Sequence, residues 1–396
     1  MRVVVAPDSF KGSLSSAEVA DAIEEGILSV FPTAQIIKIP IADGGEGTAD
    51  SLVKATKGHF MKNVVTGPLG KSVEACWGIL GDGKTAVIEM AAASGIMLIA
   101  KEERNPMITT TYGTGQLMKA ALDEGIRKLI IGIGGSATND GGAGMAKALG
   151  VKFLDPEGKE LPNGGAALKN LAGIDRSGLD PRLAETEILV ACDVDNPLCG
   201  PRGASAVYGP QKGATPEMVQ QLDEALRHYA LIAKNTMGKD ILESPGAGAA
   251  GGLGAGLMIF TQAVLKPGIQ IVLEAAGFEE KVKQADFVIT GEGRTDSQTA
   301  HGKAPVGVAA VANKYKVPTL CLSGGLGQGA DEVLEKGIAG LMSIVPGPMS
   351  LEECLGSARE LVQTAAGRLC RILSVGMDMP PKGVSNNNNS CNCRKT

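Results

Sequence analysis

The first fifty residues alternate short apolar runs with polar loops and amphipathic stretches. Residues 3–5 are all valine, which predicts a short buried strand, and Pro7 ends it. Apolar residues at helical spacing predict a helix over 17–30, and residues 36–41 form a second strand. Two strand–loop–helix units in succession indicate a parallel α/β sheet.

The loop after the first strand, residues 8–16, is dense in polar side chains. It contains Asp8, Lys11 and several serines, and Ser15 with Glu18 has the Ser-x-x-Glu spacing of a helix capping box. Such a loop offers backbone N–H groups and the positive end of the following helix dipole. Loop 8–16 therefore predicts an anion site to which Lys11 adds a full charge.

The loop after the second strand, residues 42–48, places Asp43 and Glu46 among three glycines. Glycine lets a ligand approach these carboxylates closely, although a plain turn with two solvated acids would look similar. Ligands of parallel α/β sheets bind at the carboxyl ends of the strands, which is where both loops lie.

From about residue 62 the pattern changes to that of antiparallel strands, most clearly over 73–77 and 85–90. Between them, residues 78–85 satisfy the P-loop expression G-x-x-x-x-G-K-[ST]. A P-loop needs a strand before it and a helix after it. Here the Asp-Gly pair lies between two strands, which is typical of a hairpin turn, so we reject a P-loop.

The densest glycine loop of the chain follows a predicted strand over 128–133 and precedes a helix that runs through Ala148. Its glycines and polar side chains predict a cradle for phosphate groups. The residues expected to contact the phosphates are Gly134, Gly135, Ser136, Asn139 and Gly141.

The same stretch also imitates a dinucleotide fingerprint, Gly132-x-Gly134-x-x-Ala137, with Asp155 near the distance for a ribose contact. This makes a nicotinamide-dependent oxidoreductase of small hydroxy acids the second hypothesis. In a true fingerprint the helix starts directly after the glycines, whereas here residues 138–142 lie between the glycines and the predicted helix. This difference argues against the oxidoreductase.

Two later strands also end in charged loops. Strand 188–191 leads to Asp193 and Asp195, which could hold hydrated Mg²⁺ or simply cap the turn before Pro197. Strand 287–290 opens the most informative loop of the second half. That loop carries Glu292, Arg294, Asp296, His301 and Lys303.

Composition narrows the class of protein. The net charge of −5 and an aromatic content of 3% argue against nucleic-acid and anionic-membrane partners. We expect no signal peptide or membrane span, because a strand starts two residues in and no apolar run reaches roughly 18 residues. The eight cysteines show no zinc spacing, which predicts a reduced, cytoplasmic enzyme.

The loops together suit phosphoryl transfer. This chemistry needs a phosphate cradle, a cation, Mg²⁺ on carboxylates and a group that orients or deprotonates the acceptor hydroxyl. The chain has no G-x-S-x-G nucleophile elbow and only three histidines. A small anionic acceptor would explain a lysine or arginine near that hydroxyl.

Four long motifs resemble those of the bacterial class I glycerate kinases, and the match runs in order from residue 1 to about residue 375. The motifs are APDSFKGS at 6–13, PIADGGEGT at 40–48, GIGGSATNDGG at 132–142 and TGEGRTD at 290–296. The resemblance implies ATP-dependent phosphorylation of D-glycerate to 2-phosphoglycerate.

The resemblance also implies a two-domain α/β architecture. We expect a Rossmann-like parallel-sheet domain built from both chain ends, residues 1–62 and 284–376. A second α/β domain, residues 63–283, is inserted between them, and residues 377–396 form an asparagine-rich disordered tail.

Roles within the site are our inference rather than family assignments. Ser9, Lys11 and Arg294 are predicted to hold the glycerate carboxylate or the transferred phosphoryl group, with Asp8 and Glu46 also binding substrate. Asp43 or Asp296 would take the proton from the acceptor hydroxyl. The glycine loop would bind ATP, and Asp193 with Asp195 would hold Mg²⁺.

This arrangement requires a cleft between the domains that closes to exclude water. A third hypothesis is a non-catalytic sensor of sugar acids, although the chain has no basic face or DNA-binding module to support signalling. A homo-oligomer stays open, since the sequence does not determine the oligomeric state.

Overall fold

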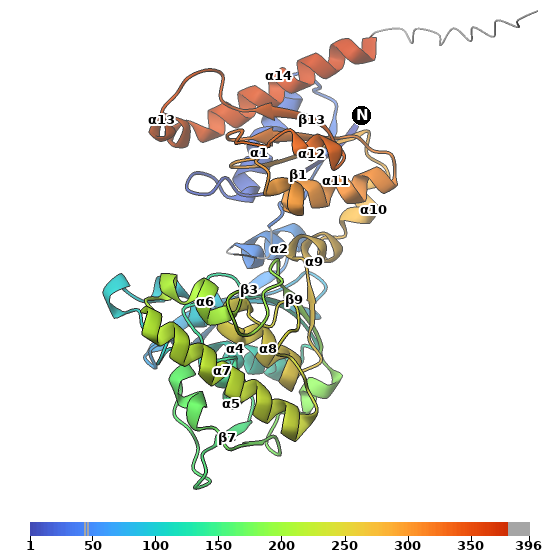
Figure 1. The fold of residues 1–396 in the computed structure, drawn as a ribbon. Coiled ribbons are helices and arrows are strands. Elements are labelled where there is room, and N and C mark those ends of the chain that lie inside the picture. The colour runs from blue at the N-terminus through green and yellow to red at the C-terminus, as the bar shows by residue number, and fades with distance from the viewer. Residues whose placement is uncertain (43–44, 46, 379–396) are drawn as a thin grey trace, which may run out of the picture.

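A computed structural model describes residues 1–42, 45 and 47–378 of the chain, which folds around two main sheets (Figure 1). The first sheet is entirely parallel, in the strand order β13-β12-β11-β1-β2. It combines strands from both ends of the chain, as predicted. Its strands are β1 (Arg2–Pro7), β2 (Gln35–Lys38), β11 (Phe287–Glu292), β12 (Thr319–Ser323) and β13 (Ile338–Ser343).

The second sheet has the order β10-β9-β6-β5-β4-β3, with parallel pairing from β10 to β5 and antiparallel pairing from β5 to β3. The β4–β5 connection is a hairpin with Gly83 at φ 65°, so the rejection of a P-loop is confirmed. The strands are β3 (His59–Thr66), β4 (Ser72–Ile79), β5 (Thr85–Glu89), β6 (Lys128–Gly132), β9 (Glu187–Ala191) and β10 (Val264–Lys266); a small ribbon pairs β7 (Lys152–Leu154) with β8 (Gly173–Asp175).

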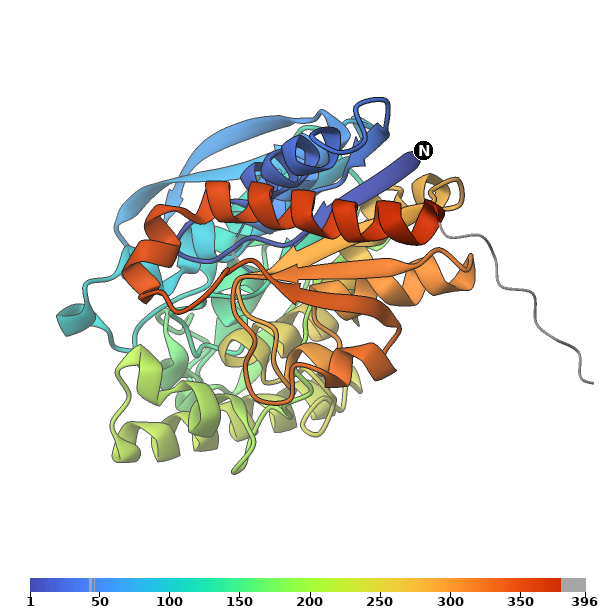
Figure 2. The same ribbon diagram turned by 90° about the horizontal axis from the view of Figure 1, so that it is seen from above.

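Strand β1 buries alternate residues on opposite faces of its sheet, as strand geometry requires. Val3 and Val5 pack in one apolar cluster with α1 (Ser16–Leu28) and α14 (Ala358–Asp378). Val4 and Ala6 face the other cluster, which includes α11 (Ala304–Lys314). Figure 2 shows α14 lying alongside α1.

Helices α2 (Thr48–Thr56) and α9 (Gly268–Ala275) lie between the two sheets (Figure 1). Both belong to an apolar cluster that also contains Val4 of the first sheet and Val87, Ile130 and Leu189 of the second. The apolar core therefore continues from one sheet to the other through these two helices. Our domain boundaries at 62/63 and 283/284 stay a prediction, and β3 already begins at His59.

The other face of the second sheet packs against α4 and α8, and further helices cover these. The remaining α-helices are α3 (Ala91–Ser94), α4 (Tyr112–Asp123), α5 (Ala143–Ala148), α6 (Ala204–Tyr208), α7 (Pro216–Met237), α8 (Ala249–Phe260), α10 (Phe278–Val282), α12 (Glu332–Glu335) and α13 (Leu351–Gly356). In the part of the chain that the structure describes, no helix combines the length and hydropathy that crossing a bilayer would require.

Helix α4 begins at Tyr112, directly after three consecutive threonines. Thr109 donates a side-chain hydrogen bond to the carbonyl of Ala137, and the N–H and hydroxyl of Thr111 donate to Asp140. Both threonines are therefore held by partners that lie outside the helix. These contacts attach the start of α4 to the glycine-rich loop.

We expect Gly26→Ala to lower the free energy of unfolding by about 1–3 kcal/mol, as overpacking does. A Cβ at Gly26 would lie 2.4 Å from the backbone oxygen of Gln363 and 2.6 Å from the Cβ of Ala366, both on α14. Gly376, also on α14, is the matched control, because nothing lies within 4 Å of its added Cβ. Gly376→Ala should gain up to about 1 kcal/mol of helix propensity. Urea unfolding measures both; equal stabilisation would contradict tight α1–α14 packing.

Candidate functional site

The loop after β1 is held in place at both ends. The N–H of Asp8 donates to the carbonyl of Gly291 at the end of β11, and the N–H of Ser9 donates to Oδ1 of Asp8 at 2.6 Å. At the other end, Ser15 and Glu18 form the predicted capping box. Gly12, at φ 85°, allows the tight turn between these anchors. The Asp8 side chain is nearly buried, whereas Lys11 is exposed.

The loop after β11 lies beside the β1 loop, because β1 and β11 are neighbours in the sheet. Its Glu292 is mostly buried, and its Oε1 accepts hydrogen bonds from the hydroxyls of Thr295 (3.0 Å) and Thr299 (2.7 Å). Burial raises the pKa of Glu292, and these two hydrogen bonds oppose the shift. Glu292 thus holds the loop that carries Arg294 and Asp296.

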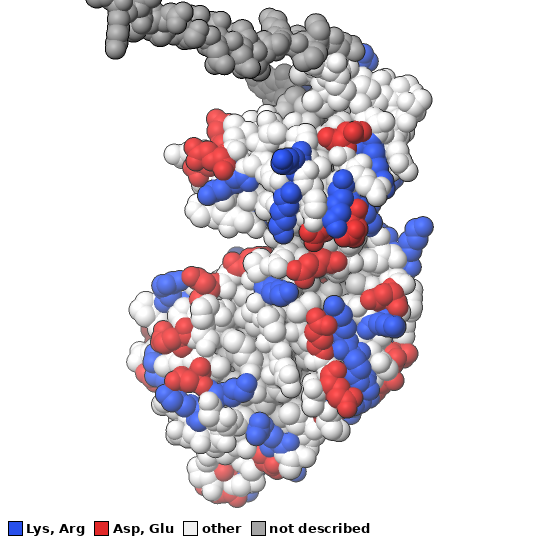
Figure 3. All heavy atoms as spheres, turned by 90° about the vertical axis from the view of Figure 1, so that its right-hand side faces the viewer, with Lys and Arg blue, Asp and Glu red and all other residues white. Residues whose placement is uncertain are grey.

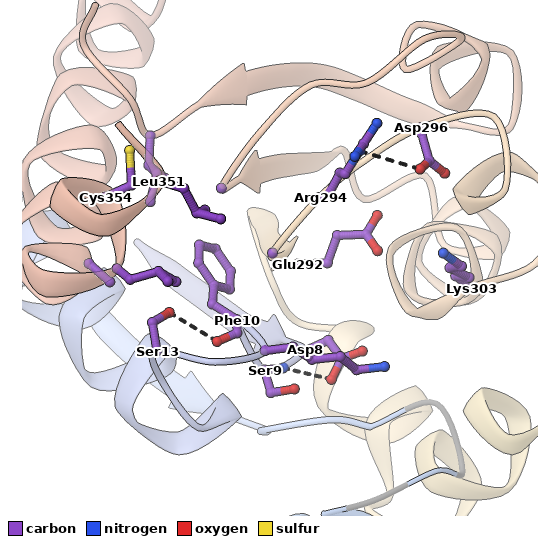
Figure 4. Close-up of a pocket in the computed structure, with 16 residues that line it drawn as sticks. Asp8, Ser9, Phe10, Ser13, Glu292, Arg294, Asp296, Lys303, Leu351 and Cys354 are labelled. Carbon is purple, nitrogen blue, oxygen red and sulfur yellow. Dashed lines mark hydrogen bonds and ion pairs between the residues drawn. The ribbon is translucent and has the colours of Figure 1, made fainter. Parts of the chain in front are cut away.

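Arg294 and Asp296 project from this loop as a loose ion pair, with Arg294 Nε 3.6 Å from Asp296 Oδ2 (Figure 4). The Arg294 side chain is 71% exposed, while the Asp296 side chain is 24% exposed. Oδ1 of Asp296 accepts from the N–H of Gln298. The pair therefore presents one cation and one carboxylate that are oriented but not sealed from solvent.

These two loops line a pocket of about 360 Å³, which we call the β1–β11 pocket (Figure 4). Its polar side brings together five residues predicted from the sequence. Its other side is apolar, with Phe10 and Ile344 beside Leu351 and Leu355 of α13. The predicted residues in it are Asp8, Ser9, Lys11, Arg294 and Asp296.

A second pocket, of about 470 Å³, is lined from both sheets, and we call it the inter-sheet pocket. Lys11 and Gly45 contribute from the first sheet. The second sheet contributes Asp193 and the glycine-rich loop through Gly134, Gly135 and Ser136. The two loops approach closely here, since a Cβ at Gly134 would lie 3.3 Å from the Cα of Gly45. Figure 3 shows the molecule narrowed between its two halves, with charged side chains along the gap.

Of the predicted site residues that the structure describes, three do not line these two pockets. Asn139 is fully buried and donates from Nδ2 to the hydroxyl of Ser205, and Gly141 packs against the ring of Tyr229. Asp195 is 77% exposed and pairs with Arg202 at 2.8 Å. Asp43 and Glu46 lie outside the described residues.

The predicted Mg²⁺ pair is therefore divided between two environments. Oδ1 of Asp193 accepts from the N–H of Gly268 at 2.9 Å and its side chain lines the inter-sheet pocket, whereas Asp195 faces Arg202. Among the described residues, no group of three or more acidic, histidine or cysteine side chains could hold a metal. Mg²⁺ commonly takes one or two carboxylates together with substrate phosphates, so Asp193 alone fits this mode of binding.

Glu292 is a site residue that carried no predicted role. The sequence feature that could have indicated a role for Glu292 is its position at the end of a predicted buried strand. A carboxylate at the end of a strand can equally face solvent, so this position alone does not predict a role. Only the fold reveals that it anchors Thr295 and Thr299 and lines the β1–β11 pocket.

The sequence model of the glycerate kinase family matches residues 3–374 of the chain. The chain belongs to this family. Glycerate kinase from Bacillus subtilis is 55% identical over 379 residues, which is 96% of this chain and 99% of that protein. Glycerate 2-kinase from Escherichia coli is 51% identical over 377 residues, covering 95% and 99%.

The fold agrees with this assignment to the glycerate kinase family. A solved structure from Salmonella typhimurium, described as a candidate glycerate kinase 2, matches with a TM-score of 0.89 at 49% identity. The match covers 96% of this chain and 100% of that one. The family resemblance drawn from the four motifs is therefore confirmed. The geometry also weakens the oxidoreductase hypothesis, because α5 begins only at Ala143, well after Gly134.

Proposed function

We propose that the protein transfers the terminal phosphoryl group of ATP to D-glycerate and produces 2-phosphoglycerate. The observation that carries this proposal is the position of Lys11, which lines both the β1–β11 pocket and the inter-sheet pocket. A lysine shared by two adjoining pockets can neutralise the charge of a group that passes from one to the other. The names of the family members support glycerate as the acceptor.

We assign glycerate to the β1–β11 pocket. Its carboxylate would pair with the exposed guanidinium of Arg294 or with Lys11, and the hydroxyl of Ser9 would bind its oxygens. Asp296 would accept the proton of the attacking hydroxyl, because its carboxylate is oriented by Arg294 and Gln298 and is still open to the pocket. Asp43, the other predicted base, lies outside the described residues.

We assign the ATP phosphates to the inter-sheet pocket. Gly135 adopts φ 72°, so this loop turns as only glycine readily permits and can present backbone N–H groups to an anion. Ser136 adds a hydroxyl at the same margin. Asp193 would hold Mg²⁺, which neutralises charge on the phosphates when it is bound.

We infer that the reaction takes place in a cleft between two domains, 1–62 with 284–376 and 63–283. Support comes from the mixed lining of the inter-sheet pocket, to which Lys11 and the glycine loop both contribute. Closure of such a cleft would exclude water and so favour transfer to glycerate over hydrolysis of ATP.

A coupled assay of ADP release with Mg-ATP and D-glycerate tests the proposal, with ³¹P NMR to identify the product. We expect ADP release that depends on glycerate, on ATP and on Mg²⁺, and a product phosphorylated at C2. Absence of ADP release would overturn the proposed activity. Phosphorylation at C3 would retain the kinase and overturn only the product.

A further inference from the structure

Lys212 is a fully buried lysine beneath the glycine-rich loop. It ends the short 3₁₀ helix η5 (Pro210–Lys212) and is 1% exposed. Its Nζ donates to the hydroxyl oxygen of Ser136 and to the carbonyl of Thr138, both at 2.7 Å. It is not among the residues that line the inter-sheet pocket, so it reaches that pocket only through its neighbours.

The bond to Ser136 determines which way the serine hydroxyl can act. An ammonium group has donors and no acceptor, so the oxygen of Ser136 must accept from it. The single hydroxyl proton of Ser136 is then available to donate elsewhere. Ser136 lines the inter-sheet pocket with Gly134 and Gly135, so the pocket is the open direction for that proton.

The backbone of the loop is held independently of Lys212. The N–H of Ala137 donates to the carbonyl of Ser94, and the N–H of Ile96 donates to that of Gly135. Removing the amine of Lys212 would therefore leave the loop attached to the end of α3 and to the residues that follow it. What the amine adds is a direction for the Ser136 hydroxyl and a buried positive charge.

Two opposing effects determine whether Lys212 is protonated. Burial lowers its pKa to about 7, and Asp140 opposes this shift. Asp140 is itself fully buried, and its carboxylate accepts from Thr111 and from the N–H groups of Gly142 and Gly144. Lys147 and Tyr229 also interact electrostatically with Asp140. Further charged or titratable groups nearby are Arg104, whose backbone lies against Gly213, and Asp193 and Tyr208, which line the pocket.

We propose that Lys212 is a positioning residue that turns the Ser136 hydroxyl into a hydrogen-bond donor for the nucleotide phosphates. This inference rests on the proposed function, which places those phosphates in the inter-sheet pocket. Protonated Lys212 accepts nothing, so Ser136 donates to the bound phosphate. Neutral Lys212 has a lone pair that can accept a hydrogen bond from the Ser136 hydroxyl. The hydroxyl then no longer donates into the pocket.

The first test compares Lys212→Met with Lys281→Met. Lys281 is also partly buried and donates to a backbone carbonyl, that of Ala276 at 2.7 Å, but it lines neither pocket. We expect Lys212→Met to raise the KM for Mg-ATP about 10-fold to 100-fold, the range for a hydrogen bond to a charged group. The KM for glycerate and kcat should change less than about threefold. Lys281→Met should leave all three unchanged.

A double-mutant cycle with Ser136→Ala tests whether Lys212 acts through the serine. We expect the double variant to bind Mg-ADP, measured by calorimetry, no more weakly than the weaker single variant. Additive losses would overturn the proposed route through Ser136. Circular dichroism confirms that each variant is folded.

The pH profile of the wild type keeps the proposal falsifiable even if Lys212→Met does not fold. A bound phosphate favours protonated Lys212, so the KM for Mg-ATP should rise as the pH passes upward through about 7. The same rise should shrink in Ser136→Ala. A KM that is flat from about pH 6 to about pH 9 overturns the role of Lys212. Failure of the proposed function differs from this, since the wild type would then release no ADP.

Discussion

Lys11→Ala lowers kcat/KM for glycerate phosphorylation by about 10²-fold to 10³-fold, the cost of deleting one preorganised charge-stabilising donor. The reason is that Lys11 lines both pockets, so it lies beside the sites proposed for the acceptor and for the phosphates. Because the lost interaction strengthens as charge moves between the pockets, kcat should fall more than the KM for either substrate rises. Steady-state kinetics with each substrate varied in turn measure this split.

The matched control for Lys11 is Lys71→Ala. Lys71 is an exposed lysine on the β3–β4 hairpin and lines neither pocket. It should keep wild-type kinetics. If Lys11→Ala raises only the KM for glycerate and leaves kcat unchanged, Lys11 binds glycerate but does not stabilise the transition state. That result would remove the main support for transfer between the two pockets.

Asp296→Asn lowers kcat by about 10²-fold to 10⁴-fold, the usual contribution of a general base. Asparagine keeps the size of the side chain and an oxygen that can accept from Gln298, but it cannot take up the proton. The KM for glycerate should stay within about threefold of wild type, because the cation Arg294 remains. Asp331→Asn, which changes an exposed carboxylate at the start of α12, is the control.

Glu292 provides the informative comparison for Asp296. Glu292→Gln keeps an acceptor for the hydroxyls of Thr295 and Thr299, so the loop and most of the activity should survive. Glu292→Ala removes both hydrogen bonds and should raise the KM for glycerate, since Arg294 loses its support. If Glu292→Gln proves as inactive as Asp296→Asn, Glu292 and not Asp296 is the base, with a raised pKa that would shift the acidic limb of the pH profile upward.

Local patterns in the sequence were sufficient for β1, for the start of α1 and for the loops of the β1–β11 pocket. The valine run predicted β1, and the Ser15–Glu18 spacing predicted the start of α1. Loops 8–16 and 291–298 meet because parallel strands end at the same edge of a sheet, and β1 and β11 are neighbours. The four motifs were specific enough to predict the family.

Side-chain direction is what local patterns could not predict. Asp193 and Asp195 are two residues apart, yet one lines a pocket and the other pairs with Arg202. Asn139 and Gly141 belong to the glycine loop, but they turn inward to Ser205 and Tyr229. An irregular loop has no fixed period, so spacing does not determine which of its residues face a ligand.

By itself, then, the sequence determined β1, the start of α1, the family and the loops that meet at the edge of the first sheet. The tertiary structure alone decided that the buried Lys212 lies under Ser136, which is far away in the chain. The physical reason is that helices, strands and caps are stabilised by neighbours along the chain. A buried charge is instead stabilised by partners that only folding brings within reach.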